Sequence, residues 1–321
     1  MNDLTKQRKN GQYRTGMGPM ESGKLESWKT VAWNGLSLRV PPQWEVSSLA
    51  TSYLLLDDEM GPVLELKWQQ IKGLFSFKTH LKKLSRLSTS TPGVDFKEIP
   101  LPQEWQQALG NFEVKSFVWQ STEVSGKGAI LYCQECQKAI LLQFYQRQSR
   151  DDSRLPLKVL HSFRDHSEDG MVRWALFGLR VFIPQRFALV RHGFHPGHYQ
   201  LEFQHQKEHL HLNRWGPADL LLKGGDLPAW FNQKCGELNW CQVANMREYN
   251  YDGKPALQGQ SQGSIVAASR LWARMTRKLP HIWVRVWHLS SRNQILGVAA
   301  RGLKPLNEQM LEEVCSNYEM V

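Results

Sequence analysis

The chain has 321 residues, of which 41% are apolar and 22% are charged, and its formal net charge is +10. This length exceeds that of one ordinary core and favours two domains of about 150 residues each. The composition is that of a globular protein, and no run of about 18 apolar residues, the length that a membrane-spanning helix needs, is present.

Residues 1–26 predict a disordered basic tail, because they are polar and lack the apolar run of a secretory signal. The five cysteines are an odd number in a long chain, which argues against a disulfide framework. Both features predict a cytoplasmic protein.

The rest of the chain is predicted to be two diverged copies of one fold, at 27–166 and 171–321. Segment 33–46 aligns without a gap with 176–189. In each copy a short apolar strand ends at a proline, which has no backbone N–H to donate to a neighbouring strand. An aromatic residue, expected to be buried, follows three positions later. The matched residues are Gly35 with Gly178, Pro41 with Pro184, and Trp44 with Phe187.

Alternating apolar and polar residues next predict one hairpin in each copy, at 53–68 and 199–215. The tryptophan near the end of each hairpin, Trp68 or Trp215, is displaced by one position between the copies. We therefore expect a β-bulge or register slip at this point.

An amphipathic helix is expected after each hairpin. In the first copy, Phe77, Leu81 and Leu84 recur at helical spacing. In the second copy, Asp226 is the expected N-cap of the helix.

A second hairpin and a closing helix complete each copy. Residues 129–141 align without a gap with 284–296, and in the closing helices Val159 matches Val314. This order predicts an α+β fold of two tandem, mostly antiparallel sheets with helices packed on them.

A glycine-led strand that ends in proline and an aromatic, followed by a hairpin, a helix, a late hairpin and a closing helix, resembles the Mog1/PsbP-like fold. The resemblance spans most of the chain beyond the tail, with one such domain in each copy. Members of this family include nuclear-transport adaptors, photosystem accessory proteins and bacterial secretion-effector chaperones. The resemblance implies binding of another protein without chemistry, and no functional residue carries over, because no functional motif of the family is matched.

Cys133 and Cys136 form a C-x-x-C at the tip of the late hairpin, which is the shape of half a zinc knuckle. Zinc needs four ligands, and the sequence has no second C-x-x-C. The alignment places His288 and Ser291 at these positions in the second copy, so the hairpin does not need the pair. A zinc or redox site and two ordinary thiols on a turn are the alternatives.

Six histidines cluster between residues 192 and 211. Because the leucines beside them should face the core, His209 and His211 should lie together on the opposite face of the sheet. With Glu202 or His205 as a third ligand they could hold a metal; solvated histidines on a sheet face are the alternative.

The sequence has neither a nucleophile motif nor a Gly-rich phosphate loop, so we expect no catalytic residues and no cofactor other than the zinc considered above.

Residues 253–307 contain no Asp or Glu but include nine basic residues, a pattern that attracts an acidic protein or nucleic acid. A solvated basic face without a ligand is the alternative. The candidate binding residues are Arg270, Arg274, Arg277, Lys278, Arg285 and Arg292. A second basic face in the first copy is formed by Lys78, Lys82, Lys83 and Arg86.

The leading hypothesis is a non-enzymatic protein-interaction module (an adaptor, a chaperone or a complex subunit) built as an intramolecular pseudo-dimer. The duplication and the 13 tryptophans, a residue type enriched at interfaces, favour it. The expected partner is another protein, within a multi-subunit complex. The first alternative is binding of nucleic acid or another polyanion through 253–307, and a weaker one is a zinc or thiol protein that uses Cys133 and Cys136.

Overall fold

The structure is a computed structural model. The residues that it describes are 28–89, 93–146, 154–167, 169–235, 246–262 and 279–321. The expected tail at 1–26 lies outside these residues. Among the described residues, all strand pairings are antiparallel, and helices pack on the sheets. The fold is therefore α+β and sheet-rich. No described helix is long and apolar enough to cross a membrane.

We call residues 28–167 the first half and residues 169–321 the second half. The elements of the first half are β1 (Lys29–Trp33), β2 (Leu36–Val40), β3 (Glu45–Ala50), β4 (Tyr53–Asp58), β5 (Gly61–Gln70), α1 (Phe77–Thr89), β6 (Asp95–Ile99), α2 (Gln103–Ala108), β7 (Glu113–Gln120), β8 (Ser125–Cys133), β9 (Lys138–Gln146) and α3 (Arg154–His161).

The second half has a similar succession of elements. They are β10 (Met171–Leu176), β11 (Leu179–Pro184), β12 (Ala188–His195), β13 (His198–His205), β14 (Glu208–Trp215), α4 (Ala218–Leu222), α5 (Leu227–Cys235), β15 (Arg247–Tyr251), β16 (Lys254–Gln262), β17 (His281–Leu289), η1 (Ser290–Arg292), β18 (Gln294–Gly302), α7 (Glu308–Ser316) and β19 (Glu319–Met320).

Each half forms one seven-stranded sheet, and the two sheets have the same strand order. The order is β3-β4-β5-β9-β8-β7-β6 in the first half and β12-β13-β14-β18-β17-β16-β15 in the second. In both sheets the strand that comes last in the chain, β9 or β18, lies beside the one that comes third, β5 or β14. The first strand pair of each sheet also has a register shift, between Val46 and Ser48 and between Leu189 and Arg191.

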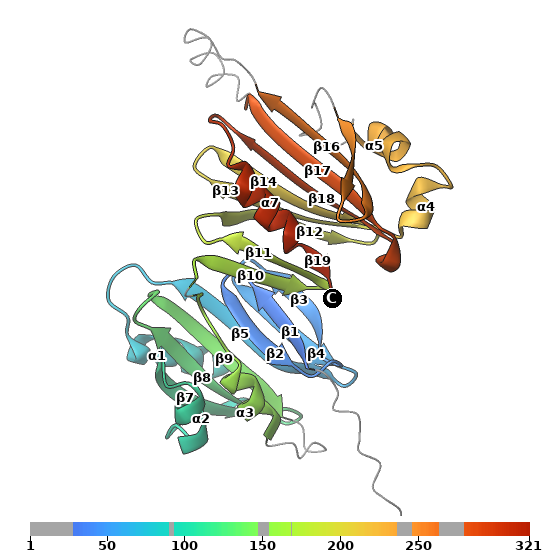
Figure 1. Cartoon of the computed structure of the whole chain (residues 1–321). Helices are drawn as coiled ribbons and strands as arrows, with labels where there is room; N and C mark the ends of the chain where they lie inside the picture. The colour runs from blue at the N-terminus through green and yellow to red at the C-terminus, as the bar shows by residue number, and fades with distance from the viewer. Residues whose placement is uncertain (1–27, 90–92, 147–153, 168, 236–245, 263–278) are drawn as a thin grey trace, which may run out of the picture.

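A five-stranded sheet, in the order β19-β11-β10-β1-β2, joins the halves across the middle of the molecule (Figure 1). Strands β1 and β10 pair in antiparallel fashion through Ala32 and Ala175. After each closing helix the chain returns to this sheet. It does so at Arg164, which pairs with Ser37, and at Glu319, which pairs with Arg180.

Two tight turns build the hairpins of the central sheet. Asn34 and Gly35 join β1 to β2, and Phe177 and Gly178 join β10 to β11; all four residues have positive φ, at 45°, 88°, 53° and 76°. Positive φ at both central residues matches the twist of paired strands in a two-residue turn. The matched glycines of the sequence therefore lie at positions where the backbone requires them.

One continuous core runs through both halves and the central sheet. At its centre, the Trp33 ring lies edge-on to Trp174, with ring centroids 5.1 Å apart, and also contacts His192. The Trp33 indole Nε1 donates to the carbonyl oxygen of Ala50 at 2.8 Å. The closing helices contribute buried residues to this core, including the matched Val159 and Val314.

The expected bulge at the hairpin tryptophans is wrong. Strand β14 pairs with β13 and β18 without a register shift, and the shift between β4 and β5 lies at Leu56 and Asp57, near the turn and away from Trp68. Trp68 packs in the continuous core, whereas Trp215 belongs to a separate cluster on the other face of its sheet. Since side chains alternate between faces, moving a tryptophan by one residue along a strand changes the face that it occupies.

The gapless match of the late hairpins is also wrong, by one residue. Ile140 lies in the continuous core, whereas its aligned residue Ile295 packs on the opposite face. The last residue pair before each tip is Cys133 with Lys138 and Leu289 with Gln294. Leu289 and Arg292, rather than His288 and Ser291, therefore occupy the positions of the cysteine pair.

Replacement of Trp33 by alanine is expected to lower the free energy of unfolding by about 3–5 kcal/mol, because it removes a buried indole from the join between the halves. Chemical denaturation measures the change. The control is Leu74→Ala, since Leu74 is fully exposed. A loss below about 1 kcal/mol for Trp33→Ala would mean that the join contributes little to stability.

Candidate functional site

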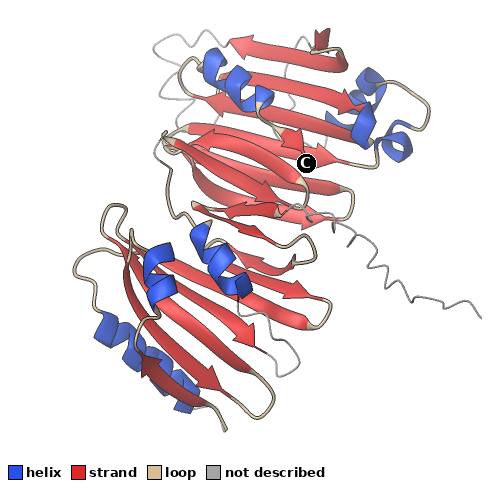
Figure 2. Cartoon of the chain, turned by 60° about the horizontal axis from the view of Figure 1, so that its bottom comes forward, coloured by secondary structure: helices blue, strands red, loops and turns tan. Residues whose placement is uncertain are grey.

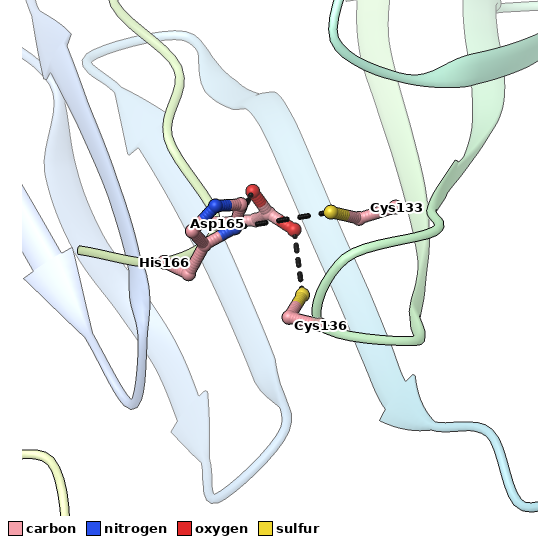
Figure 3. A group of neighbouring side chains, drawn as sticks. All are labelled: Cys133, Cys136, Asp165 and His166. Atoms are coloured by element: carbon pink, nitrogen blue, oxygen red, sulfur yellow. Dashed lines mark hydrogen bonds and ion pairs between the residues drawn. The ribbon is translucent and has the colours of Figure 1, made fainter. Parts of the chain in front are cut away.

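Four metal-ligand side chains come together at the tip of the β8–β9 hairpin (Figure 3). Cys133 ends β8 and Cys136 lies in the turn, whereas Asp165 and His166 follow the closing helix α3. One ligand atom from each of the four residues lies within 4.8 Å of all the others. Cys133 and Asp165 are buried, with 3% and 4% exposed, and the other two are half-buried.

The contacts inside this group are short. The Cys136 thiol donates to Asp165 Oδ2 at 3.0 Å, and His166 Nδ1 lies 2.8 Å from Asp165 Oδ1. Cys133 Sγ lies 3.8 Å from the same His166 Nδ1. The other ring nitrogen of His166, Nε2, lies 3.0 Å from Glu135 Oε2.

The thiol of Cys136 is held in its protonated form. Burial and the neighbouring Asp165 carboxylate together raise its pKa to about 12, because both disfavour a thiolate. In the absence of a cation, Cys136 is therefore a hydrogen-bond donor rather than a reactive thiolate.

The sequence indicated the two cysteines but not Asp165 or His166. Cys136 and Asp165 are 29 residues apart, and only the return of the chain to the central sheet brings them together. The one local signal was the adjacent Asp and His at the end of the first copy.

The cluster also borders a cavity of about 620 Å³. Its lining comes from both halves and includes Cys136, Asp165, His166, Trp68, Trp174 and Phe187. A ligand in this cavity would contact the cluster and the join between the halves.

The structure places His209 and His211 side by side, with ring centroids 6.3 Å apart. Glu202 Oε1 lies 3.4 Å from His209 Nδ1 and 4.0 Å from His211 Nε2, so Glu202 occupies the position of a third ligand. His205 does not, because its Nδ1 lies 3.0 Å from the carbonyl oxygen of Arg186. Arg301 Nη2 lies 3.8 Å from the same Glu202 oxygen, so a cation already faces this group.

Burial, reinforced by Arg301, lowers the pKa of His211 to about 3. It lowers the pKa of His209 for the same two reasons. Both rings are therefore neutral in the folded protein near neutral pH.

Not all of the candidate polyanion-binding residues in the basic stretch 253–307 lie on the surface. Arg285 is 1% exposed, and its guanidinium donates to both Glu312 carboxylate oxygens at 2.5 Å and to Gln258 Oε1. It also stacks over Tyr251, 4.7 Å from the ring centroid. The expectation of Arg285 as a polyanion-binding residue is wrong, because its charge is neutralised inside the protein.

The other candidates of that stretch divide between exposed and undescribed positions. Arg292 is exposed in the turn η1. The candidates outside the described residues are Arg270, Arg274, Arg277 and Lys278.

The second basic face lies on α1, where Lys78, Lys82, Lys83 and Arg86 are all exposed. Beside α1 is a mostly apolar groove of about 310 Å³. Its walls come from α1, β5, β8 and β9, and the lining residues include His80, Lys83, Leu84, Ile130, Ala139 and Leu141.

The corresponding sheet face of the second half is filled by large side chains. Trp215, Trp230 and Phe231 are buried there, and the Trp215 and Trp230 ring centroids lie 5.3 Å apart. Helix α5 carries two of these rings and begins as expected, with the Asp226 carboxylate accepting from the Ala229 amide at 2.8 Å. The groove beside α1 is therefore a difference between two otherwise similar sheets.

No protein-family model matches the chain, and no curated protein matches it. Among solved structures, the Saccharomyces cerevisiae Ran-binding protein Mog1p is similar over 45% of this chain and 98% of its own, with 10% identity and a TM-score of 0.32. A Mog1 mutant is similar over 47% of this chain and 96% of its own, with 11% identity and a TM-score of 0.29. A Bacteroides thetaiotaomicron protein is similar over 50% of this chain and 54% of its own, with 10% identity and a TM-score of 0.29.

Mog1 is thus among the solved structures that this chain resembles, as the strand–proline–aromatic pattern predicts. Likeness at these TM-scores defines neither a partner nor an activity for the chain.

Replacement of Arg285 by alanine is expected to lower the free energy of unfolding by about 2–4 kcal/mol, because it removes a buried charge whose partners are oriented toward it. Urea denaturation checks this. The exposed Arg292→Ala should change stability by less than about 0.5 kcal/mol. Equal effects of the two substitutions would contradict the internal role of Arg285.

Neutral, buried His211 makes stability depend on pH. Below pH 6.5 the unfolded chain takes up a proton at this residue, while the folded protein does so only near the lowered pKa of about 3. Stability should therefore fall as pH decreases from 6.5, by up to about 1.4 kcal/mol per pH unit. Denaturation curves between pH 7 and about pH 5 should show a shallower fall for His211→Gln than for the wild type. The exposed His195→Gln should retain the wild-type slope.

Proposed function

We propose that this chain is a protein-interaction module, built from two tandem copies of one domain, which binds an acidic segment of a partner protein in the groove beside α1. The observation that carries the proposal is the difference between the two sheets. Trp215, Trp230 and Phe231 fill one face of the sheet in the second half, whereas in the first half α1 packs on part of the corresponding face and leaves an apolar groove of about 310 Å³ beside it.

The duplication is supported by the symmetry of the central sheet. Ala32 and Ala175 directly precede the aligned segments 33–46 and 176–189, so they are equivalent residues, and they pair with each other. In a two-fold dimer with an isologous interface, equivalent residues also meet at the axis. The shared strand order and the matched register shifts of the two seven-stranded sheets agree with this interpretation.

The charge around α1 indicates the chemistry of the partner. Residues 66–94 contain no Asp or Glu. Their basic residues are Lys67, Lys72, Lys78, Lys82, Lys83 and Arg86. Exposed cations of one sign steer an oppositely charged partner toward the surface and fix its orientation.

The groove itself indicates how such a partner is anchored. Its floor of Ile130, Ala139 and Leu141 offers apolar surface, and Lys83 lies in its wall. An extended or helical segment with one or two apolar side chains among acidic residues would place the former in the groove and the latter on α1. Nucleic acid would use the lysines but would leave the apolar floor without a partner, which is why a protein segment is favoured.

The test compares two triple charge reversals in the full chain. The variant Lys78→Glu/Lys82→Glu/Lys83→Glu should lose the partner that the wild type captures from its host. The control, Arg247→Glu/Arg292→Glu/Lys304→Glu, changes the same number of exposed charges in the second half and should retain it. A photo-crosslinking residue at position 83 should attach to an acidic segment of that partner.

Three outcomes contradict the proposal. The first is equal capture by both variants, and the second is a crosslink to a segment without acidic residues. The third is specific retardation of RNA or DNA by the wild type that only the α1 variant loses, which would make the ligand nucleic acid.

A further inference from the structure

We propose that Cys133, Cys136, Asp165 and His166 bind one Zn²⁺ ion, which fastens the tip of the β8–β9 hairpin to the segment that follows α3. This inference is independent of the groove beside α1. It rests on the position of the four side chains, the contacts around them and the balance of charge.

The spacing of the ligand atoms suits a small tetrahedral ion. With metal–ligand bonds of about 2.0–2.3 Å, the ligand atoms of a tetrahedral zinc site lie roughly 3.3–3.8 Å apart. The separations are 2.8 Å for His166 Nδ1 to Asp165 Oδ1, 3.0 Å for Cys136 Sγ to Asp165 Oδ2, and 3.8 Å for Cys133 Sγ to His166 Nδ1. Since all four ligand atoms lie within 4.8 Å of one another, movements of about 1 Å would turn this hydrogen-bonded group into a coordination shell.

Both segments that carry the ligands are fixed by backbone contacts. Arg164 exchanges two backbone hydrogen bonds with Ser37, each of 2.8 Å, immediately before Asp165. The turn is held by Gln70, whose side-chain amide donates to the Cys136 carbonyl oxygen at 2.6 Å. The amide of Ile71 also donates to the Gln137 carbonyl oxygen at 2.9 Å. Ligands on fixed backbone lose little freedom when an ion binds.

The contact of His166 with Glu135 has the form of an outer-shell partner. A histidine that binds metal through one ring nitrogen usually donates the N–H of the other to a carboxylate or a carbonyl group. Here Nδ1 faces Cys133 and Asp165, and Nε2 lies 3.0 Å from Glu135 Oε2. Glu135 lies between the two cysteines in the sequence, so the same turn supplies both thiols and this partner.

The charge balance favours a divalent ion. Asp165 is a buried carboxylate whose neighbours in the cluster are two thiols and an imidazole, and a buried charge needs compensation. On binding, each thiol releases its proton to solvent, so two thiolates and one carboxylate would face the ion. Zinc supplies two positive charges, and Lys138, whose Nζ lies 2.6 Å from the Asp165 carbonyl oxygen, supplies a third.

The types of the four ligands indicate which metal ion the site would bind. Two thiolates with an imidazole in tetrahedral geometry favour zinc over the oxygen-preferring magnesium and calcium ions. Four protein ligands complete the coordination of zinc, which is the pattern of a structural site rather than a catalytic one. In the second half, Leu289 and Arg292 replace the cysteines, so the ion would belong to the first half alone.

The test measures zinc in the full-length protein, purified under reducing conditions and equilibrated with micromolar Zn²⁺. The wild type should hold one zinc per chain, and Cys133→Ser/Cys136→Ser should hold almost none. Cys315→Ala and His195→Ala are matched controls, because they remove a buried thiol and an exposed imidazole outside the cluster and should retain the metal. With Co²⁺ in place of zinc, the wild type should show thiolate-to-metal charge transfer and the intense visible bands of tetrahedral cobalt.

Glu135→Gln keeps the test decisive if the cysteine variants fail to fold. The Glu135 side chain is 77% exposed, so the substitution should leave the fold intact while weakening zinc affinity about 10- to 100-fold. Removal of zinc should also raise hydrogen exchange in residues 134–137 and 162–167. The proposal is overturned by a wild type without stoichiometric zinc, by cysteine variants that keep it, or by a Cys133–Cys136 disulfide formed in reducing buffer.

Discussion

The antiparallel contact of β1 with β10, through Ala32 and Ala175, is the constraint on which the rest of the structure depends. Each of these strands is one side of a two-stranded hairpin, and an isolated hairpin is marginally stable in water. Their pairing converts two exposed edges into the interior of a five-stranded sheet. The residue that follows Ala32 is Trp33, whose ring packs edge-on against Trp174 and donates to the backbone of the first seven-stranded sheet.

After each closing helix the chain returns to this central sheet, and in the first half this return brings Asp165 and His166 beside the cysteine pair. After the closing helices, Arg164 and Glu319 meet Ser37 and Arg180 on β2 and β11. In the first half, the residues directly after Arg164 are Asp165 and His166, which face the tip of the β8–β9 hairpin. The return to the central sheet thus positions two of the four ligands of the proposed zinc site.

The distribution of charge shows how the fold changes the meaning of a sequence pattern. The long acid-free stretch of the second half includes Arg285, which lies inside the protein against Glu312 and aromatic rings. It also includes Arg301, which faces Glu202. The shorter basic run on α1 stays at the surface, because only the Leu81 side of that helix packs against the sheet. The acidic partners that neutralise internal arginines come from strands and helices far away in the sequence, and a linear pattern does not reveal them.

Local patterns in the sequence determined several of the elements of this protein and their order. Alternation specified the hairpins, helical spacing specified α1, and Asp226 specified the start of α5, because each depends on nearest neighbours along the chain. The bulge expected at the displaced tryptophans was wrong, and the match of the late hairpins was wrong by one residue. A slip of one residue leaves the composition of a strand unchanged but moves its side chains to the other face of the sheet. Only the tertiary structure decided which charges are buried, which sheet face is filled, and that Asp165 and His166 lie beside Cys133 and Cys136. The physical reason is that these outcomes depend on contacts between segments far apart in sequence, which form when the two hairpins pair and the closing helices return the chain to them.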